Sequence, residues 1–434
     1  MNMALETKKE GNVVSSLAAT QPLPKMVKIK QLLDHSHYTV EEIPGIVYKE
    51  LDRPELRERI RPGMHIAITC GSRGVANIAI ITKAIVDFVK DCGAEPFVFP
   101  SMGSHGGATA EGQVEILTGY GVTEDFLGCP IKSSMDTVEI GRLDNGQPVY
   151  VDKYAYEADG IILCGRVKAH TAFRGPYESG VCKMAVIGMG KQKGAEAVHR
   201  DGFYELGKML PIIAKKIFDN TKVLAGLALG ENAFDQTCLI ESMLVEEILD
   251  KEPDFLRRTK ERLGKIYFDN IDVLVVDQIG KDISGDGMDP NITGRYAVPH
   301  MKGDIQVQHI AVLDLTEETH GNCNGLGLAD VTTKRAVDKV DVDCTYPNVV
   351  TSTVLRTPKI PLFTHSDESC IQIALRTCNY IDREHPRIVH IQDTMNLEEI
   401  YISEAMLEEA KQNEHVEVLS APEDWGFDKD GNIR

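Results

Sequence analysis

The residues of this sequence that are best suited to chemistry lie in glycine-rich, polar segments. One holds Gly71-Ser72-Arg73, and a second, "SMGSHGGAT", places His105 among glycines and serines. A third, "GRVKAHTAFRGPYESGVCK", contains His170 and ends at Lys183, and His199 follows sixteen residues later. Imidazole takes up or releases protons near neutral pH, and in its neutral form it binds nickel, copper or zinc. These segments therefore indicate acid–base chemistry, metal binding, or both.

Each of these residues also has an ordinary structural interpretation. A histidine in a glycine loop is commonly a hydrogen-bonded structural residue, and a lysine is usually solvated. The functional interpretation is favoured because the segments follow predicted strands. "HIAITCG", "EPFVFPSMG" and "DGIILCG" are short apolar runs, and patterns with helical spacing such as "NIAIITKAIVDFVKDCG" lie between them. Such alternation predicts a mainly parallel sheet, whose ligands lie beyond the carboxyl ends of the strands.

A second α/β pattern begins at "NIDVLVVDQIGKD", after a long helical region. We therefore expect two α/β domains with mainly parallel sheets and an active site in the cleft between them. The expected division is a mobile tail over residues 1–25, an N-terminal domain over 26–265, and a C-terminal domain over 266–434 that closes over the substrate.

Composition excludes several classes of protein. The formal net charge of −19 argues against a nucleic-acid-binding surface, and no apolar run is long enough to span a membrane. The N-terminal residues do not resemble a secretory signal. The ten cysteines include no CxxC pair, so we expect reduced thiols, mostly buried, in a cytoplasmic protein.

Taken together, "GSHGG", "RVKAHT", "SGVCK" and "GAEAVH" resemble the nickel-pincer-dependent lactate racemase family, which also contains racemases and epimerases of other 2-hydroxy acids. The resemblance extends from about residue 40 into the second α/β region. It implies that Lys183 is joined covalently, through a thioamide, to a nickel pincer nucleotide derived from nicotinic acid. It also implies that His199 is the protein's nickel ligand, and that His105 and His170 form the acid–base pair.

The resemblance implies roles for further residues. Arg73 falls where the family has an arginine near cofactor and substrate, and Gln278 and Lys281 in "DQIGK" match the substrate-proximal stretch. We also expect Ser72 and the glycines of "VIGMG", which are Gly188 and Gly190, to contact the cofactor. The implied partners are a small 2-hydroxy acid and the proteins that make the cofactor. Assembly into a homo-oligomer is left open.

The activity implied is inversion of the C2 centre of a 2-hydroxy carboxylic acid. Hydride would pass to the tethered nickel pincer nucleotide while a histidine takes the hydroxyl proton. The sequence departs from the lactate enzymes at Cys70, at Gly106 and at Val181-Cys182, so the acid itself is left open. The polar segment Ser284–Arg295 either holds a larger, more hydroxylated acid or is a turn cluster.

Three alternatives belong to other classes. "AVIGMGKQKG" could begin a dinucleotide-binding unit of an NAD-dependent dehydrogenase, but no strand ending in an acidic residue follows at the required distance. A non-catalytic α/β ligand-binding homologue would keep the fold without the cofactor. A hydrolytic zinc site could use His105, His170 and His199, but no HExxH motif supports it.

Overall fold

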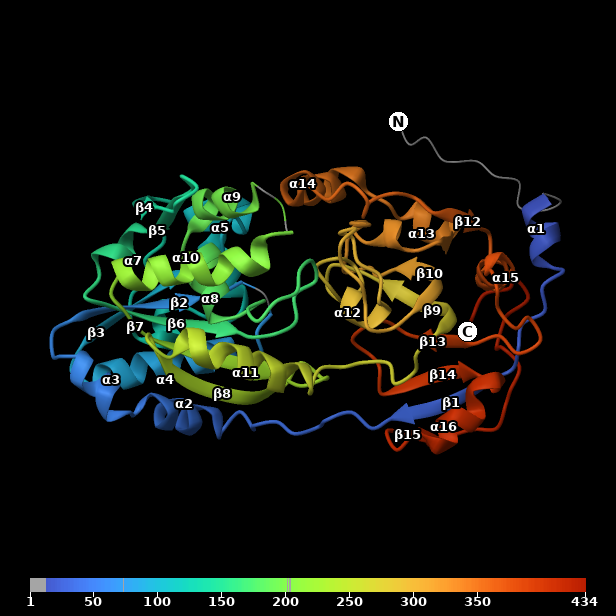
Figure 1. The fold of residues 1–434 in the computed structure, drawn as a ribbon, viewed down its shortest axis with the longest axis horizontal. Coiled ribbons are helices and arrows are strands. Elements are labelled where there is room, and N and C mark those ends of the chain that lie inside the picture. The colour runs from blue at the N-terminus through green and yellow to red at the C-terminus, as the bar shows by residue number, and fades with distance from the viewer. Residues whose placement is uncertain (1–12, 73, 201, 203) are drawn as a thin grey trace. The chain divides into compact units, whose positions relative to one another are not determined.

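The structure is a computed structural model that describes residues 13–434 except 73, 201 and 203. The chain divides into two compact units, coloured along the chain in Figure 1. The central unit comprises Asp34–Leu263, and the terminal unit combines the residues up to Leu33 with Gly264–Arg434. Both contain parallel strands alternating with helices, which confirms the predicted α/β class with mainly parallel sheets.

The central unit is built on a five-stranded sheet in the order β3-β2-β6-β7-β8, in which only the last pair is antiparallel. Its strands are β2 (His65–Cys70), β3 (Glu95–Pro100), β6 (Gly160–Arg166), β7 (Val223–Glu231) and β8 (Thr237–Leu244). A separate hairpin contains β4 (Thr137–Arg142) and β5 (Pro148–Asp152). Its helices are α2 (Ile43–Leu51), α3 (Pro54–Arg59), α4 (Ile78–Asp91), η1 (Gly106–Ala108), α5 (Ala110–Gly119), α6 (Glu124–Leu127), α7 (Lys153–Glu157), α8 (Val181–Lys183), η2 (Met184–Gly188), α9 (Lys191–His199), α10 (Leu206–Asn220) and α11 (Ile248–Lys260).

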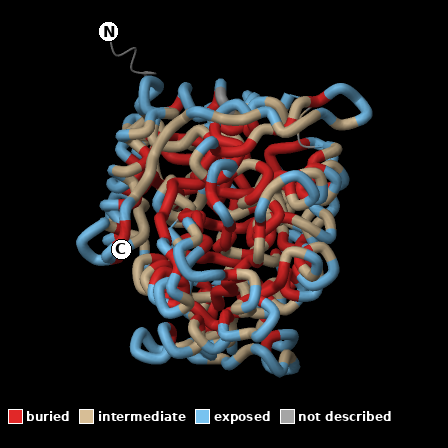
Figure 2. Tube along the Cα trace, turned by 90° about the vertical axis from the view of Figure 1, so that its left-hand side faces the viewer, coloured by how far each residue is buried: buried red, intermediate tan, exposed pale blue. Residues whose placement is uncertain are grey.

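Two apolar layers cover the faces of this sheet, and the buried stretches are red in Figure 2. Successive strand residues alternate between the layers, so that Ile66 and Ile68 pack with α2 and α4 while Ala67 packs with α8, α10 and α11. Apolar residues at helical spacing make α4 amphipathic, as the sequence predicts. The helices therefore enclose the sheet and leave its carboxyl edge to the loops.

The terminal unit has an eight-stranded sheet in the order β12-β11-β10-β9-β13-β14-β1-β15, parallel from β12 to β13. Its strands are β1 (Met26–Gln31), β9 (Ile271–Ile279), β10 (Val307–Leu315), β11 (Val331–Thr333), β12 (Leu362–Thr364), β13 (Ile388–Ile391), β14 (Glu399–Ser403) and β15 (Val416–Val418). Its helices are α1 (Val13–Ala18), α12 (Pro290–Thr293), η3 (Leu326–Leu328), α13 (Lys334–Asp338), α14 (Val342–Ser352), α15 (Asp367–Thr377), η4 (Glu404–Met406) and α16 (Leu407–Gln412).

The observed division differs from the expected boundary at residue 26. Strand β1 pairs antiparallel with β14 and β15, so residues 26–33 belong to the terminal unit. The described part of the predicted mobile tail, residues 13–25, includes α1, and Pro24 accepts a hydrogen bond from the indole of Trp425. A strand pattern indicates pairing but does not identify the partner, which here lies more than 350 residues away.

All ten cysteines are free thiols, and all but Cys92 and Cys344 are buried, as expected from their scattered spacing. None of the described helices is long and apolar enough to cross a membrane.

The position of β1 can be tested with Ile29→Ala, because the Ile29 side chain is fully buried between β14 and β15. We expect a loss of about 3 kcal/mol in the free energy of unfolding of the terminal unit. Hydrogen exchange should show reduced protection in β14 and β15, whereas Lys28→Ala on the same strand should cost much less. A loss of protection confined to residues 34–263 would contradict this placement.

Candidate active site at the carboxyl edge of the central sheet

Three neighbouring parallel strands bring the predicted polar loops to one edge of the sheet. The loops that contain Ser72, His105 and His170 follow β2, β3 and β6, which are adjacent in the order β3-β2-β6. The backbone N–H of Ser101 donates to the Cys70 carbonyl at 2.7 Å, which joins the first two loops where the strands end. The convergence expected from the sequence is therefore present in the fold.

His105 is half-buried and is held from two sides. Its Nδ1 lies 2.5 Å from the hydroxyl oxygen of Ser72, on the neighbouring loop. Its backbone carbonyl accepts a hydrogen bond from Nε2 of Gln113 at 3.3 Å, and the same amide donates to the Gly103 carbonyl at 3.0 Å. Ser72, predicted to contact a cofactor, thus has the His105 imidazole as an observed partner.

His170 is half-buried and is fixed by its own loop. The Ala172 backbone N–H donates to His170 Nδ1 at 3.0 Å, and the Phe173 ring packs against the imidazole with centroids 4.2 Å apart. The His170 backbone N–H donates to Oε2 of Glu178 at 2.7 Å. Glu178, whose side chain is fully buried, also accepts from Lys260 Nζ on α11 at 2.6 Å. The ring orientation of His170 is therefore set locally, and the loop is anchored to the fold.

Lys183 and His199 lie near enough for the charge of the lysine to act on the imidazole. Lys183 ends α8, the chain continues through one π-helical turn at η2, and α9 ends at His199. Burial lowers the pKa of His199, and the nearby Lys183 ammonium lowers it further. Both effects favour the neutral imidazole, which is the form that binds metals. Single-turn π-helices frequently occur at functional sites.

The glycines of "VIGMG" lie in close backbone packing. A Cβ at Gly188 would lie 2.6 Å from the Ser101 carbonyl oxygen, and one at Gly190 would lie 2.5 Å from the Val186 carbonyl oxygen. This packing accounts for both glycines, and their predicted contact with a cofactor stays a prediction. Residues 181–188 are helical, so the segment lacks the strand that a dinucleotide-binding turn requires.

Lys191 is a buried residue that connects several parts of the site, and nothing in the sequence indicates this role. Its side chain is fully buried, and Nζ lies 3.2 Å from Asp152 Oδ2, 2.6 Å from the Pro100 carbonyl and 3.1 Å from Gln113 Oε1. Burial lowers the pKa of Lys191 and raises that of Asp152, and the attraction between them opposes both shifts. Because Gln113 also holds the His105 loop, this ammonium joins that loop to the helix that carries His199.

Glu252 on α11 is a second buried group that the sequence does not reveal. Its Oε2 accepts a hydrogen bond from the Cys182 backbone N–H at 2.8 Å, immediately before Lys183. Gly180 is required here, because a Cβ at that position would lie 2.0 Å from Oε1 of Glu252. Burial raises the pKa of Glu252 to about 7. In the sequence, Lys191 and Glu252 look like ordinary charged residues of a helix. Only the fold shows that their side chains are buried.

The remaining predicted residues are Arg73, Gln278, Lys281 and the segment Ser284–Arg295. Arg73 falls outside the described residues. Gln278 and Lys281 are at the carboxyl end of β9 in the terminal unit, where Lys281 Nζ donates to the Gly285 carbonyl at 2.6 Å. Arg295 pairs with Asp330 at 2.7 Å and donates to three backbone carbonyls. Its role favours the turn-cluster interpretation of Ser284–Arg295.

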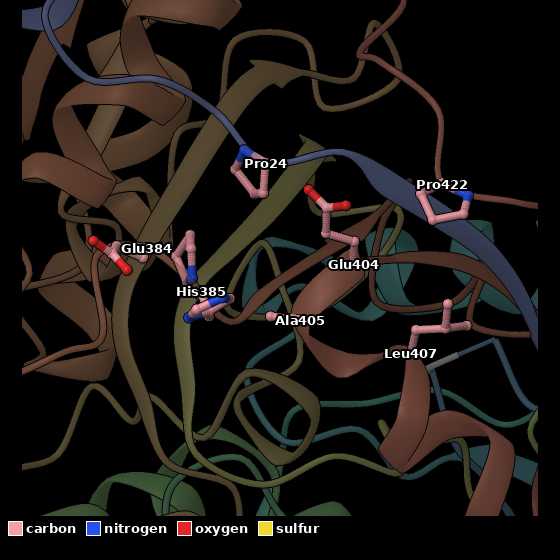
Figure 3. A pocket seen from close by; sticks show the side chains of 8 residues that line it. Pro24, Glu384, His385, Glu404, Ala405, Leu407 and Pro422 are labelled. Atoms are coloured by element: carbon pink, nitrogen blue, oxygen red, sulfur yellow. The ribbon is translucent and has the colours of Figure 1, made fainter.

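A depression on the terminal unit, shown in Figure 3, contains none of the predicted site residues. It is lined by Pro24, Glu384, His385, Pro386, Glu404, Ala405, Leu407 and Pro422. Among the described residues, no three or more His, Cys, Asp or Glu side chains are grouped to hold a metal ion. A single protein ligand, as His199 is predicted to be, requires no such group.

The fold and this edge define a class: an α/β protein with mainly parallel sheets and a lysine and three histidines carried by loops and helices beyond the sheet. Residues 17–207 match the family model of the lactate racemase N-terminal domain. This part of the chain is therefore related to the N-terminal domain of lactate racemases.

Two solved structures resemble the chain at low identity. One, of a protein from Thermotoga maritima, has 14% identity and a TM-score of 0.49, over 84% of this chain and 99% of that one. The other is the lactate racemase apoprotein from Thermoanaerobacterium thermosaccharolyticum, with 13% identity and a TM-score of 0.45, over 86% of this chain and 89% of that one. No curated protein matches the sequence.

The buried ion pair can be tested with Lys191→Met, which leaves Asp152 buried without its cation. We expect a loss of about 3–5 kcal/mol in the free energy of unfolding, measured with denaturant. Lys193→Met, at an exposed position on the same helix, should change it by about 0.5 kcal/mol or less. Equal losses in the two variants would contradict the role given to Lys191.

Glu252 predicts a pH dependence of stability. Because its pKa is raised from 4.5 to about 7 in the folded chain, the folded state binds more protons than the unfolded state between these values. The free energy of unfolding should therefore fall by about 3 kcal/mol as the pH rises through this window. Glu252→Gln should lack this component, whereas Glu261→Gln, at an exposed position, should retain it. Parallel pH profiles for the wild type and Glu252→Gln would refute the raised pKa.

Proposed function

We propose that this protein is a racemase or epimerase that inverts the C2 centre of a 2-hydroxy carboxylic acid, with a nickel pincer nucleotide tethered to Lys183. The observation that carries the proposal is that Lys183 and His199 both lie within the segment that matches the lactate racemase N-terminal domain, where the charge of the lysine reaches the imidazole. His105 and His170, on loops at the same edge of the sheet, supply the proton chemistry.

The residues present suit the proposed group. Lys183 would supply the amine for covalent attachment, and His199 would supply a nitrogen ligand whose neutral form is favoured by burial and, before attachment, by the lysine charge. The imidazole nitrogen of His199 is a donor of the kind that nickel binds. When bound, the group supplies a hydride acceptor, which side chains of proteins do not provide.

The residues of the chain handle the proton and position the substrate. The C2–H bond of a 2-hydroxy carboxylate is a poor acid, so its hydrogen leaves as hydride while a histidine takes the hydroxyl proton, and a neutral 2-oxo acid results. The oxo acid receives hydride on its other face while the second histidine returns a proton. We assign these proton transfers to His105 and His170, and binding of the carboxylate to Arg73, Gln278 and Lys281.

The proposal can be tested by intact mass and nickel content of the chain, produced together with the cofactor-making proteins of a nickel-pincer racemase. We expect a covalent adduct on Lys183, about one nickel per chain, and inversion of at least one acid in a panel of 2-hydroxy acids. Lys183→Ala should lose the adduct and the nickel, because the amine is the point of attachment. Lys193→Ala, on α9 and ten positions along the chain from the candidate anchor Lys183, is expected to retain both.

The control for this experiment is a cofactor-dependent racemase loaded in the same cells. If the control acquires the cofactor and the present chain acquires neither adduct nor nickel, the proposed function is wrong. A non-catalytic ligand-binding homologue would then be the better interpretation.

A further inference from the structure

The loop that follows β3 and carries His105 packs directly on η2, the turn that follows Lys183. The Gly103 backbone N–H donates to the Gly188 carbonyl at 3.4 Å, and a Cβ at Gly188 would lie 2.6 Å from the Ser101 carbonyl oxygen. No side chain fits between the two backbones at Gly188. The position of the His105 loop is therefore set by η2 as well as by β3.

The Gln113 side chain on α5 is fully buried and binds this loop and α9 at the same time. Its Nε2 donates to the carbonyls of Gly103 at 3.0 Å and of His105 at 3.3 Å, and its Oε1 accepts from Lys191 Nζ at 3.1 Å. An ammonium can only donate and a carbonyl can only accept, so just one orientation of the amide satisfies both sides. Gln113 therefore connects Lys191 to the His105 loop in a fixed direction.

Lys191 is fixed at the other end of this chain of hydrogen bonds. Its backbone has a φ of +55°, in the left-handed region that a lysine rarely adopts. Besides the contact with Gln113, Nζ donates to the Pro100 carbonyl at the end of β3 and lies 3.2 Å from Asp152 Oδ2. These partners hold the buried ammonium and keep the unfavourable backbone conformation in place, a combination that is most common at functional sites.

We propose that Gln113, held by Lys191, is a positioning residue for His105. Lys191 begins α9, which ends at His199, the predicted nickel ligand. The hydrogen bonds of Gln113 therefore fix the candidate acid–base group relative to the candidate metal ligand. This inference rests on the proposed function, because only a reaction that uses both histidines requires their relative position to be kept. The Lys191 charge also polarises the Gln113 amide and strengthens its two donor bonds.

Gln113→Glu tests this role because it changes only the donor end of the amide. A carboxylate can still accept from Lys191, but its other oxygen faces the Gly103 and His105 carbonyls with no proton to donate. Protonation of the carboxyl restores one donor, so this variant should hold the loop at low pH and release it as the pH rises. Gln113→Met removes both donors without adding a charge. Thr118→Glu, at an exposed position on α5, is the matched control.

The first measurement is hydrogen exchange in the chain produced without cofactor, with each variant compared with the wild type at the same pH. In Gln113→Met we expect the amides of Gly103 and His105 to exchange about tenfold faster, because two hydrogen bonds to the loop are lost. Gln113→Glu should reach the same difference only as the pH rises, and Thr118→Glu should match the wild type. Unchanged exchange at both amides would overturn the inference, and either Gln113 variant gives this answer if the other fails to fold.

The second measurement uses the chain loaded with cofactor. We expect Gln113→Met to keep its nickel content and to lose about 100-fold in kcat with little change in KM, since a displacement of about 1 Å in a reacting group costs about this much. A raised KM with unchanged kcat would contradict a positioning role.

The two measurements separate this inference from the proposed function. Failure of the wild-type chain to acquire adduct and nickel would count against the proposed function alone, because the exchange measurement needs no cofactor. A loaded and active wild type, with unaltered exchange and kcat in both Gln113 variants, would count against this inference alone.

Discussion

The parallel pairing of β3, β2 and β6 is the constraint on which the candidate site depends. In a parallel sheet, neighbouring strands end at the same edge, so residues that are about 30 to 100 positions apart in the sequence come together at that edge. The loops that contain Ser72, His105 and His170 all leave from this edge. The apolar layers on both faces of the sheet hold the strands in register, and the loops are consequently free to carry polar residues.

Buried charges then fix the loops more firmly than their sequences suggest. Lys191 joins the end of β3, the hairpin strand β5 and α5, and Glu178 and Glu252 tie the segment from His170 to Lys183 to α11. Each charged group is costly to bury and is compensated by specific partners, so loss of one partner leaves an uncompensated charge or donor. Such groups restrict the geometry of a site as well as its stability, which suits the roles proposed for His105 and His170.

In the terminal unit, one strand pairs with strands that are far away in the sequence. Strand β1 belongs to a sheet whose other members come from residues 271–418, although the chain passes through the whole central unit in between. Hydrogen bonds with β14 and β15 and the burial of Val27 and Ile29 determine this placement. Arg295 is a second example. Its polar, glycine-rich sequence neighbourhood is compatible with ligand binding, but in the fold its side chain pairs with Asp330 and donates to backbone carbonyls.

The sequence by itself determined the α/β class, the strands and helices around the loops, and the residue types that could do chemistry. These features are local: apolar periodicity defines each element, and the motifs that resemble the lactate racemase family indicate Lys183, His199 and the two loop histidines as candidates. Tertiary structure alone decided the partner of β1, the burial of Lys191 and Glu252, and the different hydrogen-bond partners of His105 and His170. The physical reason is that burial and pairing depend on residues far apart in the chain, and a charged side chain has the same appearance in a sequence whether water or another charge surrounds it.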